Sequence, residues 1–256
     1  MAQHPRLDER LAADGLAESR SQAQRLIMAG VVRVNGQRVD KASHRVAAAA
    51  TVEVDAPPRF VSRGGDKLDN AVAELADDIA ALGLSIDGAH AIDVGASTGG
   101  FTDCLLKRGA AGVVAVDVGY GQLHERLRSD PRVTVMDRTN ARHLAPADLP
   151  FQPDLIVCDA SFISLRTVLP GPLACMRRPF WGMLLCKPQF EAGRERVTKG
   201  VVRDEAVRMQ VVEETVEAVQ RLGLEVHKVV QAHPPRPKGN REYVLLIRDA
   251  GGEIAS

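Results

Sequence analysis

The segment from Ala89 to Phe101 constrains the fold of this chain more than any other stretch. It begins as a short apolar run containing an acid, Ile92-Asp93-Val94, continues through a turn of small residues and then enters a helical pattern. Strand, tight turn and helix in this order form the entrance of a nucleotide-binding βαβ unit, where glycines let the backbone approach a ligand and the helix N-terminus offers free N–H groups. We therefore predict a cofactor-binding loop, formed by Asp93, Gly95, Ala96, Ser97, Thr98, Gly99 and Gly100.

Three functional motifs compete to explain the small residues of this turn, besides a purely structural glycine turn. The G-x-G-x-x-G fingerprint of dinucleotide-binding proteins lacks its middle glycine, because Ser97 stands there. The G-x-S-x-G elbow of α/β-hydrolases fits literally, with Ser97 as the nucleophile. The third pattern, D-x-G-x-x-x-G-G, resembles motif I of S-adenosylmethionine-dependent methyltransferases. The rest of the chain has to decide among them.

Ionisable residues end the apolar strands that follow. Asp117 lies 22 residues after Gly95, close to the position at which Rossmann-like units bind a ribose. A methyltransferase or a dehydrogenase uses such an acid, whereas a serine hydrolase does not need one. The full set at strand ends is Asp93, Asp117, Asp137, Asp159 and Lys187. Because ligands bind at the carboxyl ends of parallel strands, we predict that Asp117 binds the ribose of a nucleoside and that Asp137 reaches its adenine.

Apolar, β-branched strands alternate with helical patterns to the end of the chain. This alternation predicts an α/β fold over residues 63–256, with a doubly wound, mainly parallel, seven-stranded sheet of the Rossmann-like methyltransferase type. One amphipathic helix is expected from Leu68 to Leu82, where apolar residues recur at helical spacing. A second is expected from Arg203 to Leu222.

Residues 1–56 read as a separate small α+β module. Two short helices precede a hairpin centred on Asn35-Gly36, and a linker containing proline follows over residues 57–62. Residues 1–45 hold eight Lys and Arg against five Asp and Glu, although the whole chain is balanced at 33 of each. The order of elements resembles the RNA-binding motif first seen in ribosomal protein S-four. That resemblance implies docking on folded ribosomal RNA through phosphate and shape contacts. The expected RNA-binding residues are Arg6, Arg20, Arg25 and Lys41 in this module, with Arg63 and Arg138 in the larger domain.

Four charged residues that lie far apart in the sequence form a candidate catalytic set: Lys67, Asp159, Lys187 and Glu242. In this order they resemble the Lys-Asp-Lys-Glu tetrad of FtsJ-type RNA ribose 2′-O-methyltransferases. The surrounding segments are similar to the TlyA family over nearly the whole chain, among them residues 61–68, 93–102, 117–123, 159–165, 187–191 and 239–243. The resemblance implies an enzyme that uses S-adenosylmethionine to methylate cytidines of ribosomal RNA, in a family historically also called haemolysins.

The tetrad suggests a mechanism. A ribose 2′-hydroxyl is a poor nucleophile and has to lose its proton as it attacks a methyl group in line. A lysine accepts that proton only in its neutral form, which burial and a neighbouring cation favour. We therefore hypothesise that Lys187 is the base or orients the hydroxyl and that Lys67 stabilises the developing alkoxide. Asp159 and Glu242 would position the two lysines.

Other functional classes have less support. The cysteines show no metal-ligand spacing, so no metal is expected; they are Cys104, Cys158, Cys175 and Cys186. Because no apolar run reaches the length of a membrane span and the N-terminus lacks a signal-peptide core, we expect a cytoplasmic, monomeric protein without membrane contact, and we disfavour a membrane-lytic role. Two alternatives stay open. One is a hydrolase in which Ser97 acts with Asp159 and either His227 or His233. The other is a non-catalytic RNA-binding protein.

Overall fold

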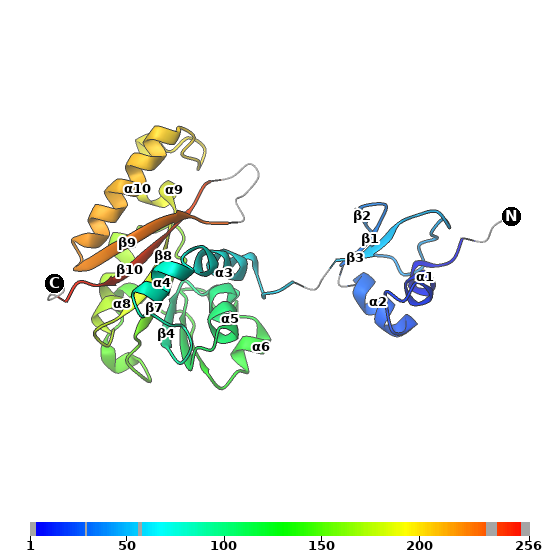
Figure 1. The fold of residues 1–256 in the computed structure, drawn as a ribbon, viewed down its shortest axis with the longest axis horizontal. Coiled ribbons are helices and arrows are strands. Elements are labelled where there is room, and N and C mark those ends of the chain that lie inside the picture. The colour runs from blue at the N-terminus through cyan, green and yellow to red at the C-terminus, as the bar shows by residue number, and fades with distance from the viewer. Residues whose placement is uncertain (1–3, 29, 56–57, 234–239, 252–256) are drawn as a thin grey trace. The chain divides into compact units, whose positions relative to one another are not determined.

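The computed structural model describes residues 4–28, 30–55, 58–233 and 240–251. The chain divides into two compact units, Met1–Arg59 and Phe60–Ser256 (Figure 1). Positions 56 and 57, where the sequence predicts the domain boundary and the start of the linker, lie outside the described residues.

The smaller unit packs two helices on a three-stranded sheet. Helices α1 (Leu7–Ala13) and α2 (Arg20–Met28) precede β1 (Val32–Val34), β2 (Gln37–Arg38) and β3 (Val52–Val54). The sheet order is β2-β1-β3, with antiparallel pairs. Asn35 and Gly36 make the turn between β1 and β2 with φ values of 50° and 76°, as a two-residue hairpin requires. The small α+β module expected from the sequence is confirmed, with a core that includes Leu7, Leu11, Ala23, Ile27 and Val32.

The larger unit is built on a seven-stranded sheet in the order β6-β5-β4-β7-β8-β10-β9. Five strands are parallel: β4 (His90–Val94), β5 (Gly112–Val116), β6 (Val133–Met136), β7 (Leu155–Cys158) and β8 (Trp181–Cys186). Strand β10 (Tyr243–Asp249) is antiparallel to β8 and to β9 (Leu224–Gln231). The mainly parallel, seven-stranded sheet of a Rossmann-like methyltransferase is therefore confirmed.

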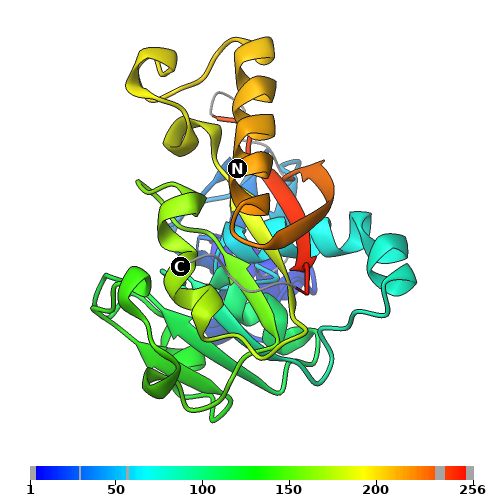
Figure 2. The ribbon, with the colours of Figure 1, turned by 90° about the vertical axis from the view of Figure 1, so that its left-hand side faces the viewer.

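Helices cover both faces of this sheet (Figure 2). One face carries α3 (Arg63–Glu74), α4 (Ala76–Ala81), α5 (Gly100–Lys107) and α6 (Glu125–Arg128). The other carries α7 (Leu165–Val168), α8 (Pro170–Ala174) and α10 (Glu205–Gln220). Short turns complete the unit: η1 (Ala141–His143), η2 (Pro146–Asp148), α9 (Pro188–Glu191) and η3 (Arg194–Arg196). Successive strand residues enter opposite cores, Ala91 one and Ile92 the other, because side chains alternate along a strand.

Two helices differ from their predicted extents. The helix expected from Leu68 to Leu82 is divided at Leu75, where φ is −95° and ψ is 10°, so that α3 ends and α4 begins there. Leu75 and Ile79 both stay in the same core, so the apolar stripe continues across the break. The helix expected from residue 203 spans Glu205–Gln220, because the Asp204 carboxylate caps it by accepting the Val207 N–H at 3.0 Å.

Candidate active site

The carboxyl ends of β7 and β8 lie beside each other, because these strands are parallel neighbours. Asp159 follows β7 and Lys187 follows β8, and their side chains form an ion pair. The Lys187 Nζ also donates a hydrogen bond of 2.8 Å to Ser161 Oγ. Its side chain is only 8% exposed, so the ammonium group is held by protein oxygens rather than by bulk water.

Lys67 and Glu242 form a second ion pair at the same edge of the sheet. Lys67 lies on α3, and Glu242 immediately precedes β10. Because β10 runs antiparallel to β8, with Tyr243 opposite Cys186, the start of β10 lies where β8 ends. The two side chains are 10% and 9% exposed, so removal of either partner would leave a nearly buried charge.

Both ion pairs line one cavity of about 620 Å³, a volume typical of small-molecule sites. The remaining wall is formed by the glycine loop, the starts of α3 and α5 and the segments that follow Asp159 and Lys187, and it includes three phenylalanines. It comprises Ser62, Arg63, Gly64, Gly95, Ala96, Ser97, Thr98, Gly100, Phe101, Ser161, Phe162, Gln189 and Phe190. The structure thus brings all four residues of the predicted tetrad together beside the predicted cofactor loop.

The loop between β4 and α5 needs small residues for two reasons. Gly95 has a φ of 82°, and a Cβ there would lie 3.0 Å from the Asp159 carbonyl oxygen. Glycine at this position therefore keeps the loop against the end of β7. Gly100 permits helix packing instead, since a Cβ there would lie 2.7 Å from the Gly65 backbone nitrogen of α3.

Asp117 lines a second cavity, of about 610 Å³, that shares Gly95, Ser97 and Asp159 with the first. Its Oδ2 accepts the Ser97 N–H at 2.8 Å and its Oδ1 accepts the Gly119 N–H at 2.7 Å. Each carboxylate oxygen has a further lone pair. The carboxylate is therefore fixed by the backbone and can still accept hydrogen bonds from two ligand hydroxyls, so the site fits a cofactor that carries a ribose.

Comparisons with known proteins agree with this geometry. A model of the FtsJ-like methyltransferase family matches residues 60–248, and a model of the S4 domain matches residues 5–52. The 16S/23S rRNA (cytidine-2′-O)-methyltransferase TlyA of Mycobacterium tuberculosis is 47% identical over 253 residues, which cover 97% of this chain and 91% of the relative. The chain belongs to the TlyA family of FtsJ-like methyltransferases.

Other relatives of this TlyA-family protein include Hemolysin A of Brachyspira hyodysenteriae, which is 38% identical over 93% of this chain and 98% of the relative. A solved structure from Streptococcus thermophilus that bears the name hemolysin has a TM-score of 0.70 at 35% identity, covering 98% of this chain and 90% of that one.

Within the residues that the structure describes, no helix is long and apolar enough to cross a bilayer. In the same residues, no three His, Cys, Asp or Glu side chains form a group that could hold a metal ion.

Three residues predicted to bind the cofactor line neither cavity: Asp93, Gly99 and Asp137. Asp93 is fully buried and accepts hydrogen bonds from the Thr102 N–H and Oγ1 at 2.9 and 2.6 Å, so it ties β4 to α5. Burial raises the pKa of its carboxyl to about 7, although the bonds from Thr102 act in the opposite direction. A Cβ on Gly99 would lie 2.3 Å from Leu127 Cδ1, so this glycine lets α6 pack closely.

Asp137 is held by two hydrogen bonds within the protein. The Arg128 guanidinium donates to its carboxylate at 2.8 Å and the Gly121 N–H at 3.2 Å. The bond from Arg128 is the main reason that the pKa of Asp137 lies below its usual value. Its predicted contact with an adenine stays a prediction.

The predicted RNA-binding residues lie in both units. In the larger unit, Arg63 lines the active-site cavity and Arg138 lies over the Tyr120 ring at 4.2 Å from its centroid. In the smaller unit, Arg25 donates to Ser21 Oγ at 3.0 Å, Lys41 lines a shallow groove with Arg38 and His44, and Arg6 and Arg20 both bind Asp8.

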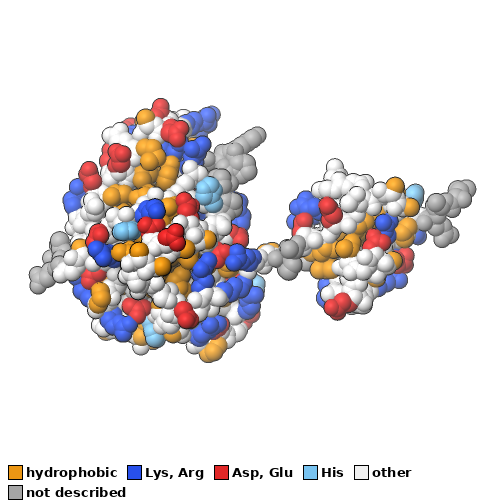
Figure 3. Space-filling model, viewed as in Figure 1, with side chains coloured by type: hydrophobic (Ala, Val, Ile, Leu, Met, Phe, Trp, Pro, Cys, Tyr) orange, Lys and Arg blue, Asp and Glu red, His pale blue; other side chains and the backbone are white. Residues whose placement is uncertain are grey.

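Basic side chains also gather where the sequence analysis did not predict them. Figure 3 shows Lys and Arg side chains over α5 and α6 of the larger unit. On these helices, the exposed Lys107 of α5 and Arg126 of α6 share the buried Asp103, at 3.3 and 2.9 Å. The two side chains belong to different helices, α5 and α6, so only the tertiary fold brings their charges together on one face of the unit.

Phe162 and Phe190 are the main site residues that sequence reasoning missed. Phe162 is 90% exposed at the mouth of the active-site cavity and has a φ of 64°. Its ring centroid lies 4.9 Å from that of Phe190. A phenylalanine in an apolar sequence pattern is normally expected in the core. Only the exposure of Phe162 in the folded protein shows that its ring is available to contact a ligand.

The serine-hydrolase alternative finds no support in the geometry. The Ser97 hydroxyl donates to Gln122 Oε1 at 3.1 Å, and in the described residues no histidine bonds it. His227 is paired with Asp78 of α4 at 3.4 Å. Without a base on the serine, the G-x-S-x-G match is explained by the backbone of the cofactor loop.

Proposed function

We propose that this protein transfers a methyl group from S-adenosylmethionine to the ribose 2′-hydroxyl of a cytidine in ribosomal RNA. The observation that carries the proposal is the meeting of Lys67, Asp159, Lys187 and Glu242 in one cavity beside the glycine loop. The Mycobacterium tuberculosis relative bears the name of a cytidine 2′-O-methyltransferase of 16S and 23S rRNA, which supplies the substrate class.

The cofactor would be held by Asp117 through its ribose hydroxyls and by the backbone from Gly95 to Ser97. When bound, S-adenosylmethionine supplies an electrophilic methyl group whose sulfonium leaves as a neutral thioether. No protein acid is therefore needed for the leaving group. Gly95, Ser97 and Asp159 line both cavities, so a ligand bound by Asp117 can present a reactive group to the tetrad.

The proton of the 2′-hydroxyl would be taken or oriented by Lys187. Its Nζ is positioned by the Asp159 carboxylate and by Ser161 Oγ, with a longer contact of 3.4 Å to the Asp159 carbonyl oxygen. The substrate hydroxyl would replace this longest of the three contacts. Lys67, held by Glu242, would stabilise the negative charge that develops on the ribose oxygen. The acids act as positioning residues for the two amines.

The base of the target nucleotide would stack on the aromatic pair at the cavity mouth. Phe162 and Phe190 present rings beside the tetrad, and an exposed ring can stack on an unpaired base. The basic N-terminal unit and basic residues of the larger unit would bind the phosphates of folded ribosomal RNA. Such phosphate contacts position the RNA but do not distinguish one sequence from another.

Nucleoside mass spectrometry tests the proposal. Unmodified small and large ribosomal subunits are incubated with the protein and S-adenosylmethionine, and 2′-O-methylcytidine is quantified. We expect a new modification on at least one subunit, lost in Lys187→Ala and kept in Lys228→Ala, a control at an exposed lysine of β9. Absence of 2′-O-methylcytidine on both subunits, with cofactor binding intact, would overturn the assigned substrate.

A further inference from the structure

A fully buried carboxylate lies beside two of the predicted RNA-binding arginines. Asp8, in the first turn of α1, has no exposed surface. Its negative charge repels phosphate, so it is unexpected in a unit that has to bind a polyanion. Burial of an ionised group also costs free energy unless the group is fully paired.

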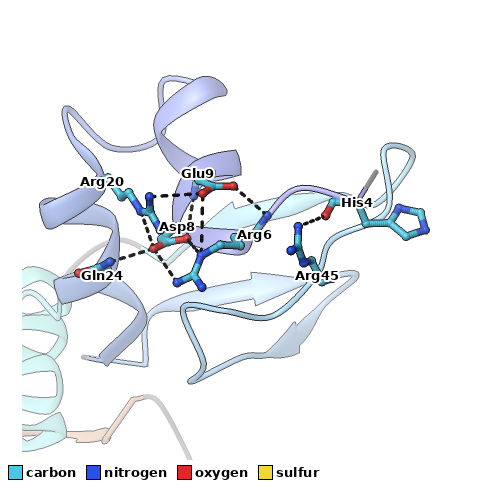
Figure 4. A network of polar contacts seen from close by, with 7 residues as sticks. All are labelled: His4, Arg6, Asp8, Glu9, Arg20, Gln24 and Arg45. Atoms are coloured by element: carbon cyan, nitrogen blue, oxygen red, sulfur yellow. Dashed lines mark hydrogen bonds and ion pairs between the residues drawn. The ribbon is translucent and has the colours of Figure 1, made fainter. Parts of the chain in front are cut away.

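Asp8 is fully paired (Figure 4). Arg6 donates to its two oxygens from Nε and Nη2 at 3.0 and 3.1 Å, and Arg20 donates from Nε at 2.9 Å. The Gln24 side chain adds a bond of 2.8 Å and the Glu9 N–H one of 3.1 Å. The bonds from Arg6 hold the pKa of Asp8 well below its usual range against the effect of burial, so the carboxylate stays charged at neutral pH.

This arrangement holds two guanidinium groups close together. Like charges on flexible side chains would otherwise separate, and the shared carboxylate prevents this. The backbone is fixed as well, since the Leu7 N–H donates to the His44 carbonyl at 2.8 Å. Arg6 and Arg20 remain 31% and 52% exposed. A guanidinium has five N–H donors, and the contact with Asp8 occupies two of Arg6 and one of Arg20.

Glu9 marks the place where an anion can bridge the pair. One oxygen of its carboxylate, Oε1, lies 3.3 Å from Arg20 Nη1 and 3.9 Å from Arg6 Nε. The Glu9 side chain is 43% exposed, unlike that of Asp8. It therefore occupies the open side of the arginine pair and can be displaced by a stronger anion.

We propose that Asp8 is a positioning residue that holds Arg6 and Arg20 as a preformed site for one backbone phosphate of folded RNA, at the place of the Glu9 carboxylate. The inference rests on the RNA-binding role proposed above. Two arginines and Asp8 carry one net positive charge, and Glu9 balances it until a phosphate takes its place. Guanidinium groups suit this ligand because their planar forks match phosphate oxygens.

Charge-neutralising variants distinguish this site from general electrostatics. If net charge alone decided affinity, replacing any acid of this unit by its amide would strengthen binding to RNA. We expect instead that Asp8→Asn weakens binding of the full-length chain to unmodified ribosomal subunits about 5-fold and lowers the salt dependence by about one counterion. Glu9→Gln should strengthen binding roughly 3-fold. Glu53→Gln, at an exposed acid of β3, is the charge-matched control and should not weaken it.

Each outcome decides the inference. An Asp8→Asn protein that unfolds at the same temperature as the wild type and binds equally or more tightly overturns it. If this variant does not fold, Arg20→Lys decides, because lysine keeps the charge and loses the fork: weaker binding supports the site, and unchanged binding overturns it. Methyl transfer is measured in parallel. A wild type that neither binds nor methylates either subunit overturns the proposed function as well, whereas a binding and methylating wild type with an indifferent Asp8→Asn overturns the phosphate site alone.

Discussion

Lys67 and Glu242, which are 175 positions apart in the sequence, form a buried ion pair at the N-terminal end of β10. The pair should matter for both stability and reaction. Lys67→Met would leave the Glu242 charge without its partner, and we expect the free energy of unfolding to fall by on the order of 3 kcal/mol. The double variant Lys67→Met with Glu242→Gln should regain most of that loss and still lack methyl transfer. Urea denaturation measures the first effect; a single variant as stable as the wild type would contradict it.

Lys187→Arg tests whether this position needs a removable proton. Arginine preserves the charge beside Asp159 but cannot be deprotonated in proteins. We expect kcat to fall at least about 100-fold, the usual range for loss of general base catalysis, with cofactor affinity unchanged by calorimetry. Wild-type turnover in this variant would leave Lys187 with a purely electrostatic role.

Asp117→Asn tests the ribose contact. The amide retains one oxygen, so the hydrogen bond from Ser97 or that from Gly119 is lost together with one ligand contact. We expect cofactor affinity to fall about 10-fold, equivalent to about 1.4 kcal/mol, with RNA binding unaffected. Asp137→Asn, measured in the same calorimetric titration, shows whether the acid held by Arg128 contributes at all.

Phe162→Ala tests the stacking surface. Because the side chain is 90% exposed, its removal should leave the thermal unfolding temperature unchanged. Loss of one base–aromatic stack costs roughly 1–3 kcal/mol, so we expect kcat/KM for RNA to fall about 10-fold while cofactor affinity stays constant. Phe162→Trp should restore activity. An unaffected alanine variant would mean that the target base binds elsewhere.

The Glu191 carboxyl should make stability depend on pH. It accepts the Leu165 N–H at 2.8 Å, and burial raises its pKa to about 7. A carboxyl whose pKa is higher in the folded than in the unfolded state binds its proton more tightly when folded. This contribution to stability is therefore present at low pH and lost as the pH rises through 7.

We expect Glu191→Gln to remove on the order of 2 kcal/mol of the stability difference between pH 5 and pH 8. Asp93, with a pKa also raised to about 7, should leave a residual pH dependence of similar size and the same direction in this variant. Urea denaturation at both pH values measures the difference in the free energy of unfolding between them. Glu195→Gln, at a 76% exposed neighbour, is the matched control. Equal slopes in the wild type and Glu191→Gln would show that this carboxyl titrates normally.

The sequence by itself determined the local structure of this protein and the chemical character of its strand ends. The order of strand, small-residue turn and helix after Ala89 depends on hydrophobic periodicity and backbone freedom, which neighbouring residues encode. The same holds for the hairpin at Asn35-Gly36 and for the acids that follow apolar strands. The grouping of the tetrad came from its resemblance to a family, since nothing local links Lys67 to Glu242.

Tertiary structure decided which of these residues meet. Glu242 reaches the site because β10 runs antiparallel to β8, an orientation that no short-range pattern specifies. Asp93 lies inside β4, one residue before its end, whereas Asp117 follows β5, and Asp93 is buried against Thr102 rather than facing a cavity. Phe162 is exposed, although a large apolar side chain is normally expected in the core. Strand order, strand direction and burial depend on contacts between distant segments, and they separate the acids that bind ligands from those that hold the fold together.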